Sequence, residues 1–158
     1  MKYNFDEIVP RKHTNCLKYD NVMEIFGTES TARLLLAKKL LTINNSRYPL
    51  IEFSFTGSGE QETYILESVI NAGYVPIVAH PERYKYMQEN PILLNTWKSL
   101  GCLFQINQGS FLGHFGEHAR FIAYEMTARG FSSVVALTLT SSMSISRAFA
   151  ILSRISSM

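Results

Sequence analysis

The chain has 158 residues, of which 46% are hydrophobic and 18% charged, and its formal net charge is +2. These values are typical of one globular domain with a real core and argue against a disordered chain. The basic residues are scattered, so nothing indicates a nucleic-acid groove. No apolar run is long enough to span a membrane, and the start carries acids and no apolar signal segment, so we expect a cytoplasmic protein.

The first part of the chain is predicted to be an arm followed by a helix. Residues 1–29 are polar and aromatic, and they predict an arm or a short helix rather than a domain. Residues 30–41 predict an apolar helix with two lysines toward solvent. Cys16 and Cys102 lie far apart in unlike contexts, so we expect two free thiols rather than a disulfide.

From Arg47 onward, predicted strands and helices alternate. Strands are predicted at 48–55, 74–79, 102–107 and 131–139, and helices at 60–71, 82–88, 91–100 and 114–128. Helical connections of this length indicate parallel strands joined by right-handed crossovers. The sequence therefore predicts an α/β fold with about four parallel strands, either as an open sheet or as an arc of a barrel.

The tail differs in composition from the rest of the chain. Residues 141–158 contain seven serines and no acid, and Arg147 and Arg154 are the only charged side chains there. We therefore expect three segments: an arm at 1–33, an α/β domain at 34–140 and an atypical tail at 141–158.

The second predicted strand runs directly into His80-Pro81-Glu82-Arg83. This places an imidazole, a carboxylate and a guanidinium at the carboxyl end of a strand, where α/β proteins usually carry their chemistry. Histidine suits a divalent metal and arginine suits a phosphate. A structural alternative is that His-Pro simply opens a helix with Glu82 in its first turn.

Glu52 is a second candidate ligand, because a carboxylate inside the apolar run Leu50-Ile51-Glu52-Phe53 is costly unless it is paired or binds a cation. Glu52 and His80 would form part of a site for manganese, iron or zinc. The alternative is an ion pair between Glu52 and Arg83 or Arg47. His114 and His118 have the i, i+4 spacing of some zinc sites, but without the accompanying Glu we expect a solvated helix face.

The central block resembles a known family. The segments that carry the resemblance are Ser46-Arg47-Tyr48, Leu50-Ile51-Glu52-Phe53, Gly73 to Tyr84, Gly101 to Asn107 and Ser110 to Gly116. Together they are similar to the bacterial protein-tyrosine phosphatases of the polymerase-and-histidinol-phosphatase (PHP) class, which occur in capsular and exopolysaccharide gene clusters. The resemblance covers roughly residues 34–136.

This resemblance implies a partial (β/α) barrel of PHP type and a manganese-dependent phosphatase. Its substrate would be phosphotyrosine on a tyrosine kinase that regulates polysaccharide export. Carried over by position, Glu52 and His80 match Mn²⁺ ligands, and Arg83 matches a phosphate-binding arginine. Arg147 stands where the family often places a second phosphate arginine.

The sequence also departs from the family. The family opens with a His-x-His strand, which this chain does not contain, and Ala136-Leu137-Thr138-Leu139-Thr140 stands where the family has Ala-Ser-Asp-Ala-His. A frameshift near Ala136 would explain the replacement of Ala-Ser-Asp-Ala-His and the acid-free tail. We therefore expect an impaired or inactive phosphatase, with a non-catalytic binding or remnant protein as the alternative.

Residues 1–29 resemble a different family, the pyridoxal-phosphate-dependent C–S lyases of the cystathionine β-lyase type. The segments concerned are Lys2 to Val9, Lys18 to Asn21 and Phe26 to Glu29. No lyase body follows, so we infer no pyridoxal chemistry; a lyase fragment, supported only by this segment, is a further alternative for the function. A partial barrel would expose sheet edges, and we expect it to oligomerise, to aggregate or to cover its open side with residues 1–41 and the tail.

Overall fold

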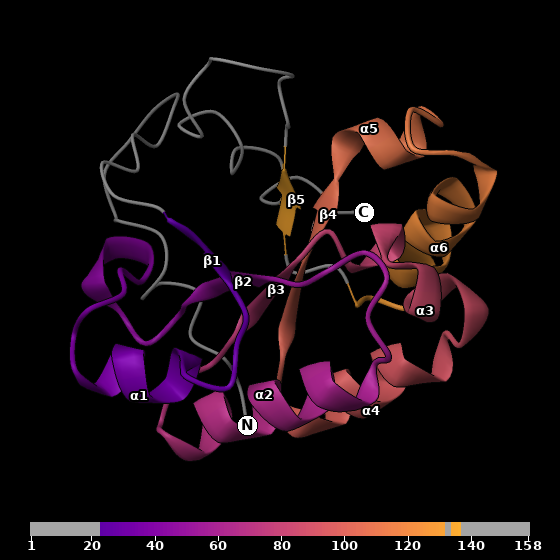
Figure 1. The fold of residues 1–158 in the computed structure, drawn as a ribbon. Coiled ribbons are helices and arrows are strands. Elements are labelled where there is room, and N and C mark those ends of the chain that lie inside the picture. The colour runs from indigo at the N-terminus through magenta and orange to yellow at the C-terminus, as the bar shows by residue number, and fades with distance from the viewer. Residues whose placement is uncertain (1–22, 132–133, 137–158) are drawn as a thin grey trace, which may run out of the picture.

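The computed structural model describes residues 23–131 and 134–136. These residues form one parallel sheet of five strands whose spatial order follows their order in the chain (Figure 1). The strands are β1 (Glu24–Phe26), β2 (Leu50–Glu52), β3 (Ile77–Ala79), β4 (Leu103–Asn107) and β5 (Val134–Ala136). The α/β class with parallel strands and flanking helices is therefore confirmed. Sequential parallel order is also the order in a barrel, in which each strand lies beside the preceding one.

Helical segments connect consecutive strands. They are α1 (Thr31–Leu36), η2 (Ile43–Asn45), α2 (Glu60–Asn71), η3 (Pro81–Arg83), α3 (Lys85–Glu89), α4 (Ile92–Leu100), α5 (Gln108–Phe111) and α6 (Glu117–Ala128). Helix α2 has the predicted bounds. Its start is fixed by Glu62, whose carboxylate accepts the backbone N–H of Gly59 at 2.7 Å. None of the helices in the described ranges is long and apolar enough to cross a membrane.

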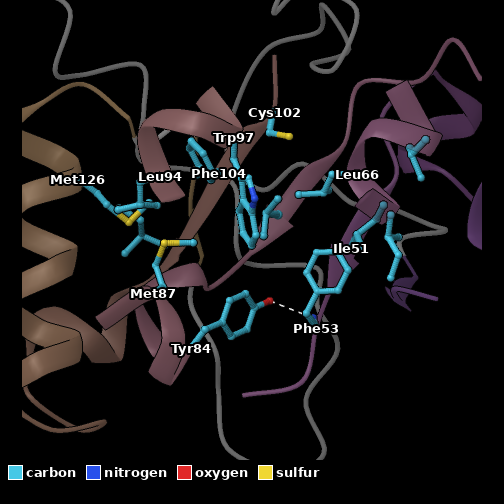
Figure 2. Packing of buried hydrophobic residues seen from close by; sticks show 14 of the residues in the cluster. Ile51, Phe53, Leu66, Tyr84, Met87, Leu94, Trp97, Cys102, Phe104 and Met126 are labelled. Atoms are coloured by element: carbon cyan, nitrogen blue, oxygen red, sulfur yellow. Dashed lines mark hydrogen bonds between the residues drawn. The ribbon is translucent and has the colours of Figure 1, made fainter. Parts of the chain in front are cut away.

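Two apolar clusters lie on the two faces of the sheet. The larger one packs the sheet against the helices and includes Phe53, Leu66, Trp97 and Phe104 (Figure 2). A smaller cluster involves Leu50, Ile77, Ala79 and Leu103, which alternate along their strands with members of the first. Successive side chains of a strand point to opposite faces. Glu24, which is opposite Leu50, and Glu52, which is two residues after Leu50, therefore lie on the same face of the sheet as the smaller cluster.

The structure corrects the prediction of an arm or short helix for the end of residues 1–29. Glu24–Phe26 form strand β1, which pairs in parallel with β2 and so belongs to the same sheet as the central block. Residues 1–22 lie outside the described residues, as does the whole tail 141–158, so the division at 33/34 and at 140/141 stays a prediction. Cys102 is a buried free thiol and Cys16 is not described.

Candidate functional site

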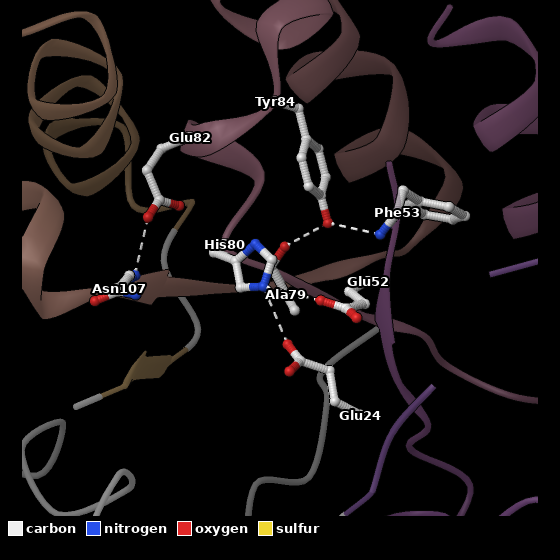
Figure 3. A network of polar contacts seen from close by, with 8 residues as sticks. All are labelled: Glu24, Glu52, Phe53, Ala79, His80, Glu82, Tyr84 and Asn107. Atoms are coloured by element: carbon white, nitrogen blue, oxygen red, sulfur yellow. Dashed lines mark hydrogen bonds and ion pairs between the residues drawn. The ribbon is translucent and has the colours of Figure 1, made fainter. Parts of the chain in front are cut away.

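Three side chains from the first three strands meet: Glu24 is the first residue of β1, Glu52 is the last residue of β2, and His80 directly follows β3. His80 Nε2 lies 3.1 Å from Glu24 Oε1 and 3.5 Å from Glu52 Oε2 (Figure 3). One donor atom from each of the three residues lies within 4.8 Å of the others. We call Glu24, Glu52 and His80 the Glu-Glu-His cluster.

The register of the sheet brings these residues together. Glu24 is opposite Leu50 and Phe26 is opposite Glu52, so Glu24 and Glu52 lie on the same face of neighbouring strands. His80 directly follows β3, the next strand in the sheet. Three consecutive strands therefore deliver three donors to one place, Glu24 from the start of β1 and Glu52 and His80 from the carboxyl ends of β2 and β3.

His80 has an unusual backbone conformation, with φ 34° and ψ 50°. This left-handed region is uncommon for a residue with a side chain, and such conformations cost about 1–3 kcal/mol. The His80 N–H donates to the carbonyl of Gln105 at 2.7 Å, which helps to hold it. The strained turn directs Nε2 at the two carboxylates, while Nδ1 is buried and has no hydrogen-bond partner in the part of the chain that is described.

The electrostatics of the cluster favour a cation. Burial raises the pKa of Glu52, and repulsion from Glu24 raises it further, whereas His80 and Arg83 act in the opposite direction. Two carboxylates therefore lie close together in a partly desolvated place. Two carboxylate oxygens and one imidazole nitrogen form a donor set that suits manganese, iron or zinc, so the residues present fit a divalent metal.

Arg83 is half-buried on η3, near the cluster. Its guanidinium carbon lies 4.7 Å from the ring centre of Phe55 and 4.1 Å from that of Phe115. Its positive charge opposes the rise in the pKa of Glu52. Its backbone N–H donates to the carbonyl of His80 at 3.0 Å, but no hydrogen bond or ion pair to its guanidinium occurs among residues 23–131.

Glu82 has a structural role rather than a place in the cluster. Its Oε1 accepts the backbone N–H of Asn107 at 3.0 Å (Figure 3). It also accepts the hydroxyl of Ser110 at 2.6 Å, so it joins the segment after β3 to the end of β4 and the start of α5. Glu82 is fully buried, and this burial raises the pKa of its carboxyl group.

Tyr84 fixes the same loop to β2. Its hydroxyl donates to the carbonyl of Ala79 at 2.7 Å and accepts the N–H of Phe53 at 3.0 Å. The ring is fully buried (Figure 2). Glu82 and Tyr84 therefore anchor the segment that carries His80 and Arg83 to strands on both sides.

A cleft of about 400 Å³ opens between the loops after β1 and β2 and the first turns of α2. Its lining mixes aromatic and polar side chains, with Phe26, Glu29, Ser54 and Gln61 among them. Since Phe26 ends β1 and Ser54 comes shortly after β2, the cleft lies at the carboxyl ends of these strands, the edge of the sheet at which Glu52 and His80 also lie.

The structure brings the predicted residues Glu52 and His80 together and places Arg83 nearby, although metal and phosphate binding stay predictions. His114 and His118 are exposed and do not belong to the cluster. Arg147 lies outside the described residues. Glu24 was missed, although Met23-Glu24-Ile25-Phe26 shows the same signal as the Glu52 run, a carboxylate within a short apolar stretch.

The comparisons with known proteins all lead to one family. The family model "Capsular polysaccharide synthesis, CpsB/CapC" matches residues 5–146. The tyrosine-protein phosphatase YwqE of Bacillus subtilis is 36% identical over 86 residues, which are 54% of this chain and 34% of YwqE. The tyrosine-protein phosphatase CpsB of Streptococcus pneumoniae is 36% identical over 101 residues, covering 63% of this chain and 42% of CpsB.

A solved structure supports the same assignment. It was described for YwqE and CpsB as "unique metal-dependent tyrosine phosphatases", and it matches with a TM-score of 0.67 and 30% identity over 73% of this chain and 47% of the other. The chain thus spans less than half the length of these relatives. The resemblance of residues 1–29 to lyases finds no support, since the family match begins at residue 5 and includes most of that segment. The chain belongs to the CpsB/CapC family of capsular polysaccharide synthesis proteins.

Proposed function

We propose that this chain binds a divalent cation through Glu24, Glu52 and His80 and a phosphoryl group beside Arg83, as a domain of the protein-tyrosine phosphatase type. The observation that supports this is the approach of His80 Nε2 to the carboxylates of Glu24 and Glu52, at 3.1 Å and 3.5 Å. Relatives named tyrosine-protein phosphatases and a neighbour described as metal-dependent support the choice of reaction. By family resemblance, the metal we propose is Mn²⁺.

The candidate residues would have different roles in binding the metal and the phosphoryl group. Glu24 and Glu52 supply negative charge and oxygen donors, and His80 supplies a neutral nitrogen donor. When bound, the metal supplies positive charge and Lewis acidity to a phosphoryl group. Arg83 offers planar N–H donors that match the geometry of phosphate oxygens and stabilise the negative charge on them.

We further propose that hydrolysis is impaired. The sequence has no His-x-His pair, and Ala136-Leu137-Thr138-Leu139-Thr140 stands in place of the run that supplies Asp and His. Within the described ranges the donor cluster consists of three residues. The second candidate is accordingly a module that binds metal and phosphate without turnover, and the small donor set favours it.

The substrate we propose is phosphotyrosine on a tyrosine kinase that controls polysaccharide export, and the place of action is the cytoplasm. Arg147 would be a second phosphate ligand, provided that residues beyond Ala136 are read in the family's frame. Association of two or more copies is also proposed, because β1 and β5 are the end strands of the described sheet.

The test combines metal binding with hydrolysis of p-nitrophenyl phosphate. His80→Asn is the sharpest variant, because asparagine tolerates the left-handed conformation of residue 80 and so removes the ligand with little effect on folding. We expect calorimetry to show Mn²⁺ binding by the original chain and a loss of at least about tenfold in affinity for the variant.

The outcomes separate the candidates. Mn²⁺-dependent hydrolysis that His80→Asn abolishes would support a working phosphatase. Mn²⁺ binding without hydrolysis would support the binding module. Failure of the folded original chain to bind Mn²⁺ would contradict both.

A further inference from the structure

We propose that Phe55 and Phe115 are positioning residues that hold the guanidinium of Arg83 in the orientation for binding phosphate. This inference rests on the proposed function and adds two residues to it, neither of which belongs to the metal cluster. It starts from two ring contacts made by a single arginine.

The contacts have the geometry of cation–π interactions. Arg83 Cζ lies 4.7 Å from the centre of the Phe55 ring and 4.1 Å from that of Phe115, and both distances are inside the range of about 6 Å for this interaction. The two rings come from separate loops, one after β2 and one between α5 and α6. The long side chain of Arg83 is thus restrained from two directions.

The ring contacts do not use the five N–H donors of the guanidinium, which lie in its plane. Within residues 23–131 the backbone N–H of Arg83 donates to the carbonyl of His80, but no hydrogen bond or ion pair to the guanidinium occurs. An arginine whose guanidinium donors have no partner in this part of the chain suits a ligand with several acceptor oxygens, such as a phosphate.

Burial does not account for the two phenylalanines. Phe55 is 41% exposed and Phe115 is 38% exposed, although both are large apolar side chains. Their ring contacts with Arg83 therefore give them a role at the surface that core packing would not require. Each ring also lies beside the candidate site rather than on a distant face.

The backbone fixes the position of both rings. The carbonyl of Phe55 accepts the N–H of Lys85 at 2.9 Å, which joins the loop after β2 to the segment that follows Arg83. Phe115 packs so closely on helix α5 that a Cβ at Gly109 would lie 2.9 Å from its Cε2. Gly109 thus leaves room on α5 for the ring of Phe115 beside the arginine.

The two rings differ in one respect that makes them separable by experiment. Phe55 also stacks on His80, with ring centres 5.7 Å apart and an angle of 30° between the planes. Phe55 therefore contacts both Arg83 and the candidate metal ligand His80, whereas Phe115 contacts Arg83 but not His80. Loss of the Phe55 ring should affect metal and phosphate, and loss of the Phe115 ring should affect phosphate only.

The experiment measures binding of inorganic phosphate to the full chain loaded with Mn²⁺, by isothermal titration calorimetry. We expect Phe115→Leu to weaken phosphate binding by about two- to fivefold, the size of one cation–π contact. Phe115→Tyr keeps an aromatic ring and should bind phosphate as tightly as the original chain. Mn²⁺ affinity should be the same for all three proteins. Phe121→Leu on α6 is the matched control, since Phe121 is 62% exposed.

A double-variant comparison links the effect to the arginine. In an Arg83→Met background, Phe115→Leu should cause no further loss of phosphate affinity, because the ring then has no guanidinium to orient. An equal loss in both backgrounds would overturn the inference. The inference would also be overturned if Arg83→Met lowered the phosphate affinity and Phe115→Leu left it unchanged. In that case the proposed phosphate site at Arg83 would still be supported. Failure of the Mn²⁺-loaded chain to bind phosphate would contradict both proposals.

Discussion

The imidazole of His80 lies 3.1 Å from the carboxylate of Glu24, although 56 positions separate the two residues in the chain. This contact depends on the parallel pairing of β1 with β2 and of β2 with β3. It changes the interpretation of the N-terminal segment, because a residue outside the block of strongest sequence resemblance becomes part of the candidate site.

The first prediction concerns Glu24. Glu24→Gln keeps the size of the side chain and removes its charge, so we expect Mn²⁺ affinity to fall by at least about tenfold, as measured by calorimetry. Glu24 is exposed, so thermal stability should change little. Glu29→Gln, in the loop after β1, is the matched control. Equal Mn²⁺ affinity of the Glu24 variant and the original chain would remove Glu24 from the site.

A second prediction follows from the buried carboxyl group of Glu82. Burial raises the folded-state pKa of Glu82 above its ordinary value of 4.5, so the unfolded chain loses this proton at lower pH than the folded chain. The free energy of unfolding should therefore fall as the pH rises above about 4.5 toward the raised pKa. Glu82→Gln keeps an oxygen for the Asn107 N–H and the Ser110 hydroxyl, and it does not ionise.

Urea denaturation at pH 5 and at pH 8 provides the measurement. The stability of Glu82→Gln relative to the original chain should be greater at pH 8 than at pH 5. An identical difference at both pH values would show that Glu82 does not titrate in this range.

The hydroxyl of Tyr84 is the subject of a third prediction. Tyr84→Phe leaves the N–H of Phe53 and the carbonyl of Ala79 without their partner in a buried place. We expect the free energy of unfolding to fall by about 2 kcal/mol in chemical denaturation. Tyr64→Phe, on the exposed side of α2, should leave stability nearly unchanged, because Tyr64 is 61% exposed. Similar losses for the two variants would argue against the buried bridge.

The fourth prediction tests the strain at His80. Glycine adopts the left-handed conformation without penalty, whereas alanine does not. His80→Gly should therefore be more stable than His80→Ala by about 1 kcal/mol in urea denaturation, and neither variant should bind Mn²⁺ tightly. Equal stability of the two variants would mean that residue 80 relaxes to an ordinary conformation in solution.

Local signals predicted much of the fold. Helix α2 was placed correctly because its amphipathic pattern is regular and Gly73 marks its end in the sequence. The strands were predicted in the right regions, but the predicted bounds were too wide. Strand β2, for example, was predicted at 48–55 and is formed by Leu50–Glu52. The extent of a strand depends on its neighbours, which local sequence does not specify.

The same reason explains what was missed at the site. His80 and Glu52 stand out in their own short segments, as an imidazole at a strand end and an acid in an apolar run. Strand β1 has only three residues, and its partner is 26 positions further along. Glu24 becomes a candidate ligand only through that pairing, and the contacts of Phe55 and Phe115 with Arg83 depend on loop positions that periodicity cannot give.

The agreement between sheet order and chain order also bears on biosynthesis. On the ribosome, each new strand emerges when its neighbour has already been made, so the donors are synthesised in the sequence Glu24, Glu52, His80. We expect a nascent chain to capture an ion only after His80 has left the exit tunnel. Acquisition of the metal would then report that the first three strands have docked.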